Sequence, residues 1–186
     1  AAADAAGLKR AAEILANASK PIIVAGDGVA QAGASDAVGR LAELTGAEIW
    51  FEPSRGRYPV AADHLCVQGS LPFDSIAMRN LFENADAIFL MGGRFFEELW
   101  YNANTSPLAG IKAKVAQIDD GEARMAQFHA VDLGLIGDIG AAADALCSAL
   151  EPGLDDAYRA AAEARLAGVA AARDERRARQ ASRTDA

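Results

Sequence analysis

The sequence contains few of the residues that carry chemistry in a self-contained enzyme. Among 186 residues there are two cysteines and two histidines. Cys66 and Cys147 lie far apart and fit no metal-ligand spacing, so we expect reduced thiols, with Cys66 inert inside an apolar run. His64 and His129 have no serine or cysteine nucleophile with a recognisable elbow beside them. We therefore predict no catalytic and no metal-binding residue in this chain.

Long apolar runs and basic clusters are also missing. No stretch reaches the roughly 18 apolar residues of a membrane helix, and no signal-peptide pattern opens the chain. The net charge is -8, and no Lys/Arg-rich run interrupts the folded region. We therefore predict a cytoplasmic protein with no nucleic acid and no membrane partner. The arginines after residue 172 alternate with acidic residues, which is typical of a solvated helix face or a frayed tail.

What the sequence does have is a repeated alternation of short apolar runs with helical periodicity. Strands are predicted at 22–25, 47–51, 65–67, 87–91, 114–118 and 133–136, and helices at 5–18, 34–45, 74–84 and 139–150. A loop is expected over 52–64, and irregular structure over 95–110. This order predicts an α/β fold, a doubly wound parallel sheet of about six strands with helices on both faces. The topology is Rossmann-like, of the DHS-like NAD/FAD-binding type.

The last part of the chain differs from the rest in composition. Pro152 and Gly153 break the chain, and an Ala/Arg/Glu-rich helical stretch follows. Its few large apolar residues are Leu154, Tyr158, Leu166 and Val169. We predict that 1–150 form one domain, and that 151–186 are a linker helix and tail. The helix is expected to dock on a part of the protein outside this chain.

Glycine or aspartate follows nearly every predicted strand. In parallel sheets of this kind, ligands bind beyond the carboxyl ends of the strands. A ligand site is therefore expected near Gly26, Pro53, Gly69, Gly92, Asp119 and Gly137. The first of these turns carries its third glycine, Gly33, too late for the GxGxxG fingerprint. It is open at this stage whether that turn binds a nucleotide or is only a tight structural turn.

Other strand-end residues leave two readings open. Asp119 and Asp120 could accept hydrogen bonds from ribose hydroxyls, or could form a cap or turn. Arg94 could bind a phosphate, although we favour a surface ion pair with one of the nearby carboxylates, those of Asp86, Glu97 and Glu98. An aromatic group, Phe95, Phe96, Trp100 and Tyr101, is either core or an interface.

Six segments follow one another in a familiar order. They are residues 20–29 (KPIIVAGDGV), 58–64 (YPVAADH), 67–69 (VQG), 84–95 (NADAIFLMGGRF), 117–120 (QIDD) and 135–138 (LIGD). They resemble "(K/R)PVIxxGxGV", "FPxxHP", "xxG", "xADLVLxLGxRF", "HIDID" and "xIxGD". These are patterns of the central domain of thiamine-diphosphate-dependent enzymes, in the acetolactate synthase and benzoylformate decarboxylase group. The resemblance runs from about Ile14 to Leu150.

The resemblance implies a three-domain parent enzyme. A first domain supplies a glutamate that activates the cofactor, and a third binds thiamine diphosphate and magnesium. Both would lie outside this chain and would be its partners, in a homo-oligomer, a dimer or tetramer. The parent would be a 2-oxo acid decarboxylase or an acetolactate synthase-like carboligase. The alternatives are a regulatory module that binds FAD, ADP or NAD, and a sirtuin-type deacylase, which usually needs a four-cysteine zinc module.

In some relatives the central domain holds FAD or ADP. The matching positions here are Gly26, Gly28, Gly69, Gly92, Arg94, Asp119 and Asp138. The family's "RFDDR" reads RFFEE at 94–98, so a second arginine is missing and two carboxylates would repel a diphosphate. Residues 50–54 (WFEPS) are closer to "WVAPS" of the decarboxylase branch. We therefore expect no tightly bound FAD, and no metal ligand at Asp27, because Asn80 is too distant for the metal motif.

Overall fold

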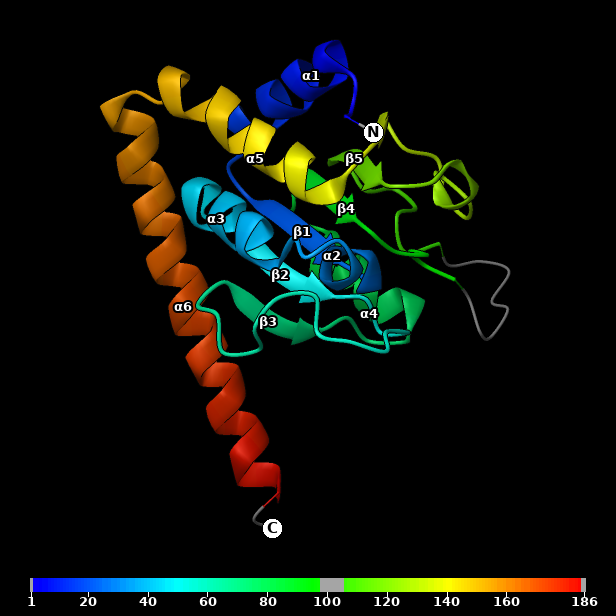
Figure 1. Ribbon diagram of the computed structural model, residues 1–186. Coiled ribbons are helices and arrows are strands. Elements are labelled where there is room, and N and C mark those ends of the chain that lie inside the picture. The colour runs from blue at the N-terminus through cyan, green and yellow to red at the C-terminus, as the bar shows by residue number, and fades with distance from the viewer. Residues whose placement is uncertain (1, 98–105, 185–186) are drawn as a thin grey trace.

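The computed structural model describes residues 2–97 and 106–184, which form a six-stranded sheet flanked by helices (Figure 1). The strands are β1 (Pro21–Ala25), β2 (Glu48–Phe51), β3 (Val67–Ser70), β4 (Ala87–Met91), β5 (Lys114–Asp119) and β6 (Leu133–Ile136). Their order is β3-β2-β1-β4-β5-β6, and every neighbouring pair is parallel. The predicted parallel α/β fold is therefore confirmed.

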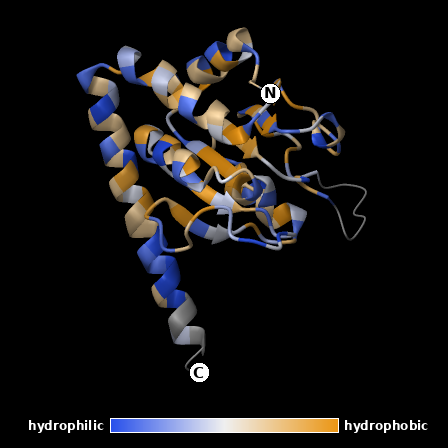
Figure 2. Ribbon diagram, viewed as in Figure 1, coloured by the Kyte–Doolittle hydropathy of each residue, from blue (hydrophilic) through white to orange (hydrophobic). Residues whose placement is uncertain are grey.

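The two faces of the sheet bury different helices. Alternate residues of a strand point to opposite faces, so Ile23 of β1 joins one core while Val24 joins the other. The first core receives α1 (Ala5–Ala16), α3 (Ser35–Thr45) and α5 (Ile139–Leu150). The second receives α4 (Ser75–Phe82), together with residues that follow β4. Hydrophobic residues concentrate on the strands and on the inner sides of these helices (Figure 2).

Short polar residues set where the helices begin. The carboxylates of Asp4, Asp74 and Asp138 accept hydrogen bonds from backbone N–H groups in the first turns of α1, α4 and α5, at 2.7 Å in each case. Such caps satisfy donors that have no partner within the helix. Gly46 ends α3 with a φ of 65°, the left-handed conformation that glycine adopts without a steric cost.

Two local predictions were wrong. The third strand lies at Val67–Ser70, two residues later than expected, and its pairing with β2 has a register shift between Ile49 and Trp50. The turn after β1 is a short helix, α2 (Asp27–Gln31), with Gly26 as its N-cap. Helix α4 buries Met78 and Phe82, whereas Ile76 is 43% exposed.

The C-terminal helix α6 (Asp156–Thr184) packs along this domain (Figure 1). It contacts α3 and the edge strand β3. Leu154 and Val169 are buried in the first core, and Tyr158 and Leu166 pack against it. The helix therefore packs on this domain, and its docking on a part outside the chain stays a prediction. The residues toward the C-terminus of α6 are mostly hydrophilic (Figure 2).

Two short 3-10 helices complete the described structure. They are η1 (Glu122–Arg124), after β5, and η2 (Glu151–Gly153), between α5 and α6. Within the residues described, none of the helices combines the length and the apolar character needed to cross a membrane.

Candidate functional site

The candidate site lies at the carboxyl ends of β1 and β4. The chain runs outward from β1 to β3, then crosses back to β4 on the other side of β1. Ligands in doubly wound sheets bind in the crevice at such a switch point. The predicted binding residues Gly26, Gly28 and Gly92 all lie here.

These glycines contact one another directly. The backbone N–H of Gly28 donates to the carbonyl oxygen of Gly92 at 2.7 Å, and that of Gly26 donates to Met91 O at 3.0 Å. A Cβ added to Gly26 or Gly28 would lie 2.6 Å or 2.8 Å from Gly92 O. The glycines thus allow two backbone segments to approach closely. The amides of Gly26 and Gly28, which a phosphate-binding turn would offer to a ligand, are used within the protein.

A buried carboxylate covers this contact. Glu52, the residue after β2, is 5% exposed, and its backbone N–H donates to Ala25 O at 2.9 Å. Its Oε2 lies 2.7 Å from the position of a Cβ on Gly26, and 2.5 Å from that of a Cβ on Gly93. The side chain therefore occupies the space above both strand ends.

The surroundings of Glu52 favour its protonated form. Burial, followed by the charges of Asp27 and Glu97, raises the pKa of Glu52 to about 7, although the backbone N–H and the charge of Arg94 act in the opposite direction. Glu52 lines a small cavity of ≈ 20 Å³, whose other lining side chains are mainly apolar and include Leu71, Met78, Phe95 and Phe96. The site can therefore hold or release a proton close to neutral pH.

Asp27 and Arg94 interact with the protein itself. The carboxylate of Asp27 accepts hydrogen bonds from the backbone N–H groups of Gly56 and Arg57, at 2.9–3.0 Å, and so anchors the loop after β2. Arg94 pairs with Glu97 at 3.1 Å, which is the surface ion pair favoured from the sequence. Glu98, the other carboxylate expected to repel a diphosphate, lies outside the described residues.

The aspartates after β5 and β6 also have local partners. Asp119 is completely buried, and its Oδ1 accepts from Nε of Arg124 at 2.9 Å; its Oδ2 has no partner among the described residues. Burial raises the pKa of Asp119 despite that arginine. Asp120 also pairs with Arg124. Asp138 caps α5.

Phe95, Phe96 and the two histidines are parts of the packing. Phe95 and Phe96 are buried in the second core, so of the two alternatives the core position is confirmed for them. Trp100 and Tyr101 lie outside the described residues. His129 contacts the Phe96 ring edge-on at 5.0 Å and shares a 3.0 Å hydrogen bond with Ser106. His64 accepts from the Cys66 N–H at 3.2 Å and lies 3.3 Å from Glu43.

Gly69 is separated from the other predicted positions. It lies in β3 with a φ of 127° and has no atom within 4 Å of an added Cβ. It faces a groove of ≈ 520 Å³ between the end of β2, the loop after it, and α6. The seven predicted positions therefore do not form one binding site: Gly26, Gly28 and Gly92 lie together, whereas Gly69 borders a different groove.

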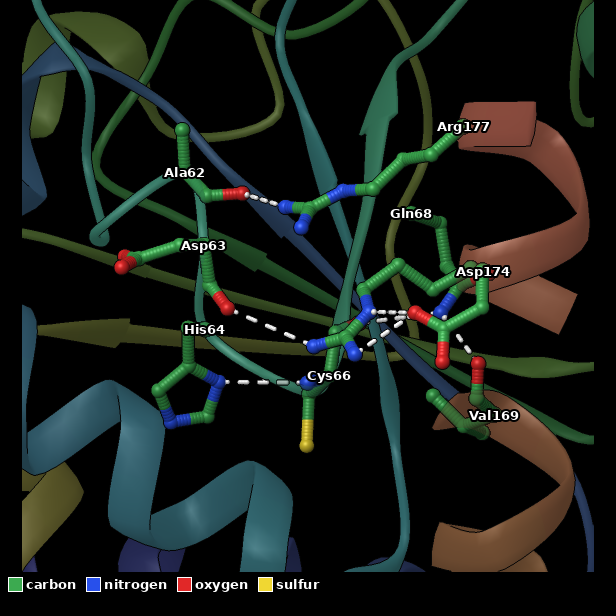
Figure 3. Close-up of polar contacts among 9 residues, drawn as sticks. Ala62, Asp63, His64, Cys66, Gln68, Val169, Asp174 and Arg177 are labelled. Carbon is green, nitrogen blue, oxygen red and sulfur yellow. Dashed lines mark hydrogen bonds and ion pairs between the residues drawn. The ribbon is translucent and has the colours of Figure 1, made fainter. Parts of the chain in front are cut away.

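The helix α6 supplies residues that the sequence analysis did not connect with any site. Arg173 donates to Asp63 O at 3.3 Å. Arg177 donates to Ala62 O, and Gln68 donates to Val169 O at 2.9 Å (Figure 3). The prediction of a solvated face was wrong for Arg173, whose side chain is 17% exposed, whereas Arg177 is exposed and still bonds to the loop. The signal that could have indicated this is their spacing, because residues three and four apart share a face of a helix.

A nucleotide diphosphate does not fit the crevice at the switch point. Two of its amides are bonded internally, and Glu52 fills the space above them. Asp27 and Glu97 add negative charge beside it. Among the described residues there is also no group of three or more His, Cys, Asp or Glu side chains that could hold a metal ion. The crevice can therefore hold a proton on Glu52, but it does not fit a large anion.

Solved structures similar to this chain are thiamine-dependent enzymes. A protein from Mycobacterium smegmatis, assigned as a thiamin diphosphate-dependent enzyme, is 27% identical with a TM-score of 0.71. The thiamine diphosphate-dependent 4-hydroxybenzoylformate decarboxylase of Rhodococcus jostii RHA1 is 24% identical (TM-score 0.71), and the benzoylformate decarboxylase of Polynucleobacter necessarius is 22% identical (TM-score 0.69). At such identities the two decarboxylases show the fold alone.

These matches cover most of this chain but only a small part of the other proteins. They cover 80–81% of this chain but only 27–28% of the other proteins. A profile of the family described as "Thiamine pyrophosphate enzyme, central domain" matches residues 8–146, which is most of the chain. The segment resemblance, the strand order and this match agree, and the chain belongs to the family of thiamine pyrophosphate enzyme central domains.

Proposed function

We propose that this chain is the scaffold domain of an enzyme that decarboxylates a 2-oxo acid, or joins it to a second carbonyl compound, through thiamine diphosphate. The cofactor would supply the carbanion chemistry, and magnesium would anchor its diphosphate on another domain. The residues described here would position those domains within a homo-oligomer. No side chain of this chain is assigned a catalytic role.

One observation carries the scaffold role. The crevice in which this fold usually binds a ligand is closed by the 2.7 Å hydrogen bond between Gly28 and Gly92 and by the carboxyl of Glu52. A domain that held FAD or ADP there would need free amides and a position for a diphosphate. The proposal is therefore that the fold keeps its architecture without the nucleotide.

Activity assays on the complete reading frame test the proposal. We expect CO2 release from benzoylformate or another 2-oxo acid only with thiamine diphosphate and magnesium present, and only when the coding sequence on both sides of this segment is included. The 186-residue chain alone is expected to be inactive. Turnover by the chain alone without the thiamine cofactor would overturn the proposal.

Nucleotide binding provides a second measurement. We expect no saturable binding of FAD, ADP or NAD by the chain at concentrations of about 10 µM, a range in which a specific nucleotide site is normally occupied. Binding at that level, lost on substitution of Gly28, would favour a regulatory nucleotide-binding module instead.

A further inference from the structure

The groove beside Gly69 differs in charge from the rest of the protein. It lies between the end of β2, the loop after it, the edge strand β3 and α6, and has a volume of ≈ 520 Å³. Its charged lining residues are Arg55, Arg176 and Arg177, with no carboxylate. The chain as a whole carries a net charge of -8. A groove with three guanidinium groups and no carboxylate is therefore a local exception to the negative charge of the chain.

The arginine on the loop side is held in position by aromatic rings and hydrogen bonds. The guanidinium of Arg55 lies over the rings of Phe51 and Tyr58, at 5.0 Å and 5.1 Å from their centroids. Its Nη1 donates to Glu52 O at 3.1 Å and to Ser70 Oγ at 2.8 Å. Ring stacking orients a guanidinium and leaves its other N–H groups available.

The arginines on the helix side approach the same groove from α6. Arg176 lies over the Trp50 ring at 4.8 Å, and its Nη2 donates to the amide oxygen of Gln68. Its buried Nε has no hydrogen-bond partner among the described residues. The Nη2 of Arg177 donates to Ala62 O. All these acceptors are neutral, so the positive charges on this wall are not compensated by the groups they bind.

Like charges brought together in a groove repel one another, and a bound anion relieves that repulsion. Guanidinium groups bind carboxylate and phosphate oxygens in pairs of parallel hydrogen bonds. Gly69 leaves open space where a side chain would otherwise enter the groove. We propose that this groove binds a small organic anion with two or more oxyanion groups, held by Arg55 on one side and by Arg176 and Arg177 on the other.

The consequence of binding follows from where these arginines lie. Arg55 belongs to the loop after β2, whereas Arg176 and Arg177 belong to α6. An anion that contacts both walls joins α6 to the sheet. Binding therefore stabilises the docked position of α6. The effect is measurable as slower hydrogen exchange of the backbone amides of that helix.

The experiment uses the 186-residue chain with inorganic pyrophosphate and citrate as probes, titrated separately by calorimetry at low salt. We expect saturable binding of at least one probe at concentrations of about 1 mM or below. Binding of pyrophosphate alone identifies a phosphate ligand, and binding of citrate alone identifies a carboxylate ligand. The absence of saturable binding by either probe overturns the proposal.

Two substitutions and a matched control locate the site. Arg55→Gln and Arg177→Gln are each expected to weaken binding at least about tenfold, the loss of one charge-assisted pair. Arg179→Gln removes the same charge from an exposed position on the same helix and is expected to leave binding unchanged. Circular dichroism of each variant checks folding, and hydrogen exchange of α6 provides a second readout. Equal weakening by all three substitutions, or ligand binding without added protection of α6, contradicts the proposal.

Discussion

The backbone N–H of Gly28 donates to the carbonyl oxygen of Gly92 at 2.7 Å, which ties the start of α2 to the end of β4. The two residues are 64 positions apart in the chain and meet where the strand order reverses. This contact occupies the crevice that would otherwise open between the two halves of the sheet.

Gly28→Ala should destabilise the protein. The new Cβ would lie 2.8 Å from the backbone atoms of Gly92, which cannot move without shifting β4. We expect a loss of about 1–3 kcal/mol in the free energy of unfolding, measured by urea denaturation. The control is Gly168→Ala, a helical position in α6 with no atom within 4 Å of the added Cβ. The Gly168→Ala substitution should stabilise the folded protein by about 0.5–1 kcal/mol. An unchanged free energy of unfolding in Gly28→Ala would show that the contact is not tight.

The stability should depend on pH through Glu52. Its pKa is raised from 4.5 to about 7 by burial and by the charges of Asp27 and Glu97. Between these values the folded state keeps a proton that the unfolded state has lost, so stability falls as pH rises from 4.5 to 7 and levels off above. The full difference amounts to roughly 3 kcal/mol.

Glu52→Gln tests this assignment because glutamine keeps the shape without the charge. At pH 8 the variant should be more stable than the wild type by up to roughly 3 kcal/mol, and the difference should disappear at acidic pH. Asp119, whose pKa is also raised, is present in both proteins and cancels in the comparison. Glu83→Gln, at an exposed position, is the control. Parallel pH profiles for wild type and Glu52→Gln would exclude Glu52 as the titrating group.

Both cysteines should be unreactive in the folded protein. Burial raises the pKa of Cys66 to about 12 and that of Cys147 to about 11, and the thiolate is the form that reacts. We expect little reaction with Ellman's reagent at pH 8 before unfolding, and two equivalents after unfolding in urea. Ser148→Cys places a thiol at an exposed neighbouring position and should react at once. Rapid native labelling of the wild-type protein would contradict the burial of these side chains.

Gln68→Ala should loosen the docking of α6. Gln68 is buried; its amide nitrogen donates to Val169 O at 2.9 Å, and its amide oxygen accepts from Arg176. Removing both bonds leaves buried groups without partners, which costs about 1–3 kcal/mol. Hydrogen exchange of α6 should accelerate, and trypsin should cleave sooner at Arg173 and Arg177. Gln31→Ala, at the exposed end of α2, should change neither measurement.

Sequence alone determined that the chain forms a parallel sheet, because strands buried on both faces have continuous apolar runs in sequence. Residues 87–91, a continuous apolar run followed by two glycines, were located correctly for this reason. Residues 114–118 were also located correctly, although Lys114 and Gln117 interrupt their apolar pattern. Helix ends at Gly46 and at the cap Asp138 could also be predicted. The family resemblance was likewise readable, because its segments recur in order along the chain.

Only the tertiary structure decided what the strand ends do and where α6 lies. Gly26 and Gly92 look like ligand-binding glycines in sequence, and their approach to each other becomes visible only when β1 and β4 pair. The raised pKa of Glu52 depends on its burial and on the charges of Asp27, in α2, and Glu97, which follows β4. The arginines of α6 look solvated in sequence, because their acceptors lie more than 100 residues away along the chain. Local pattern encodes secondary structure, whereas burial and charge pairing depend on long-range contacts.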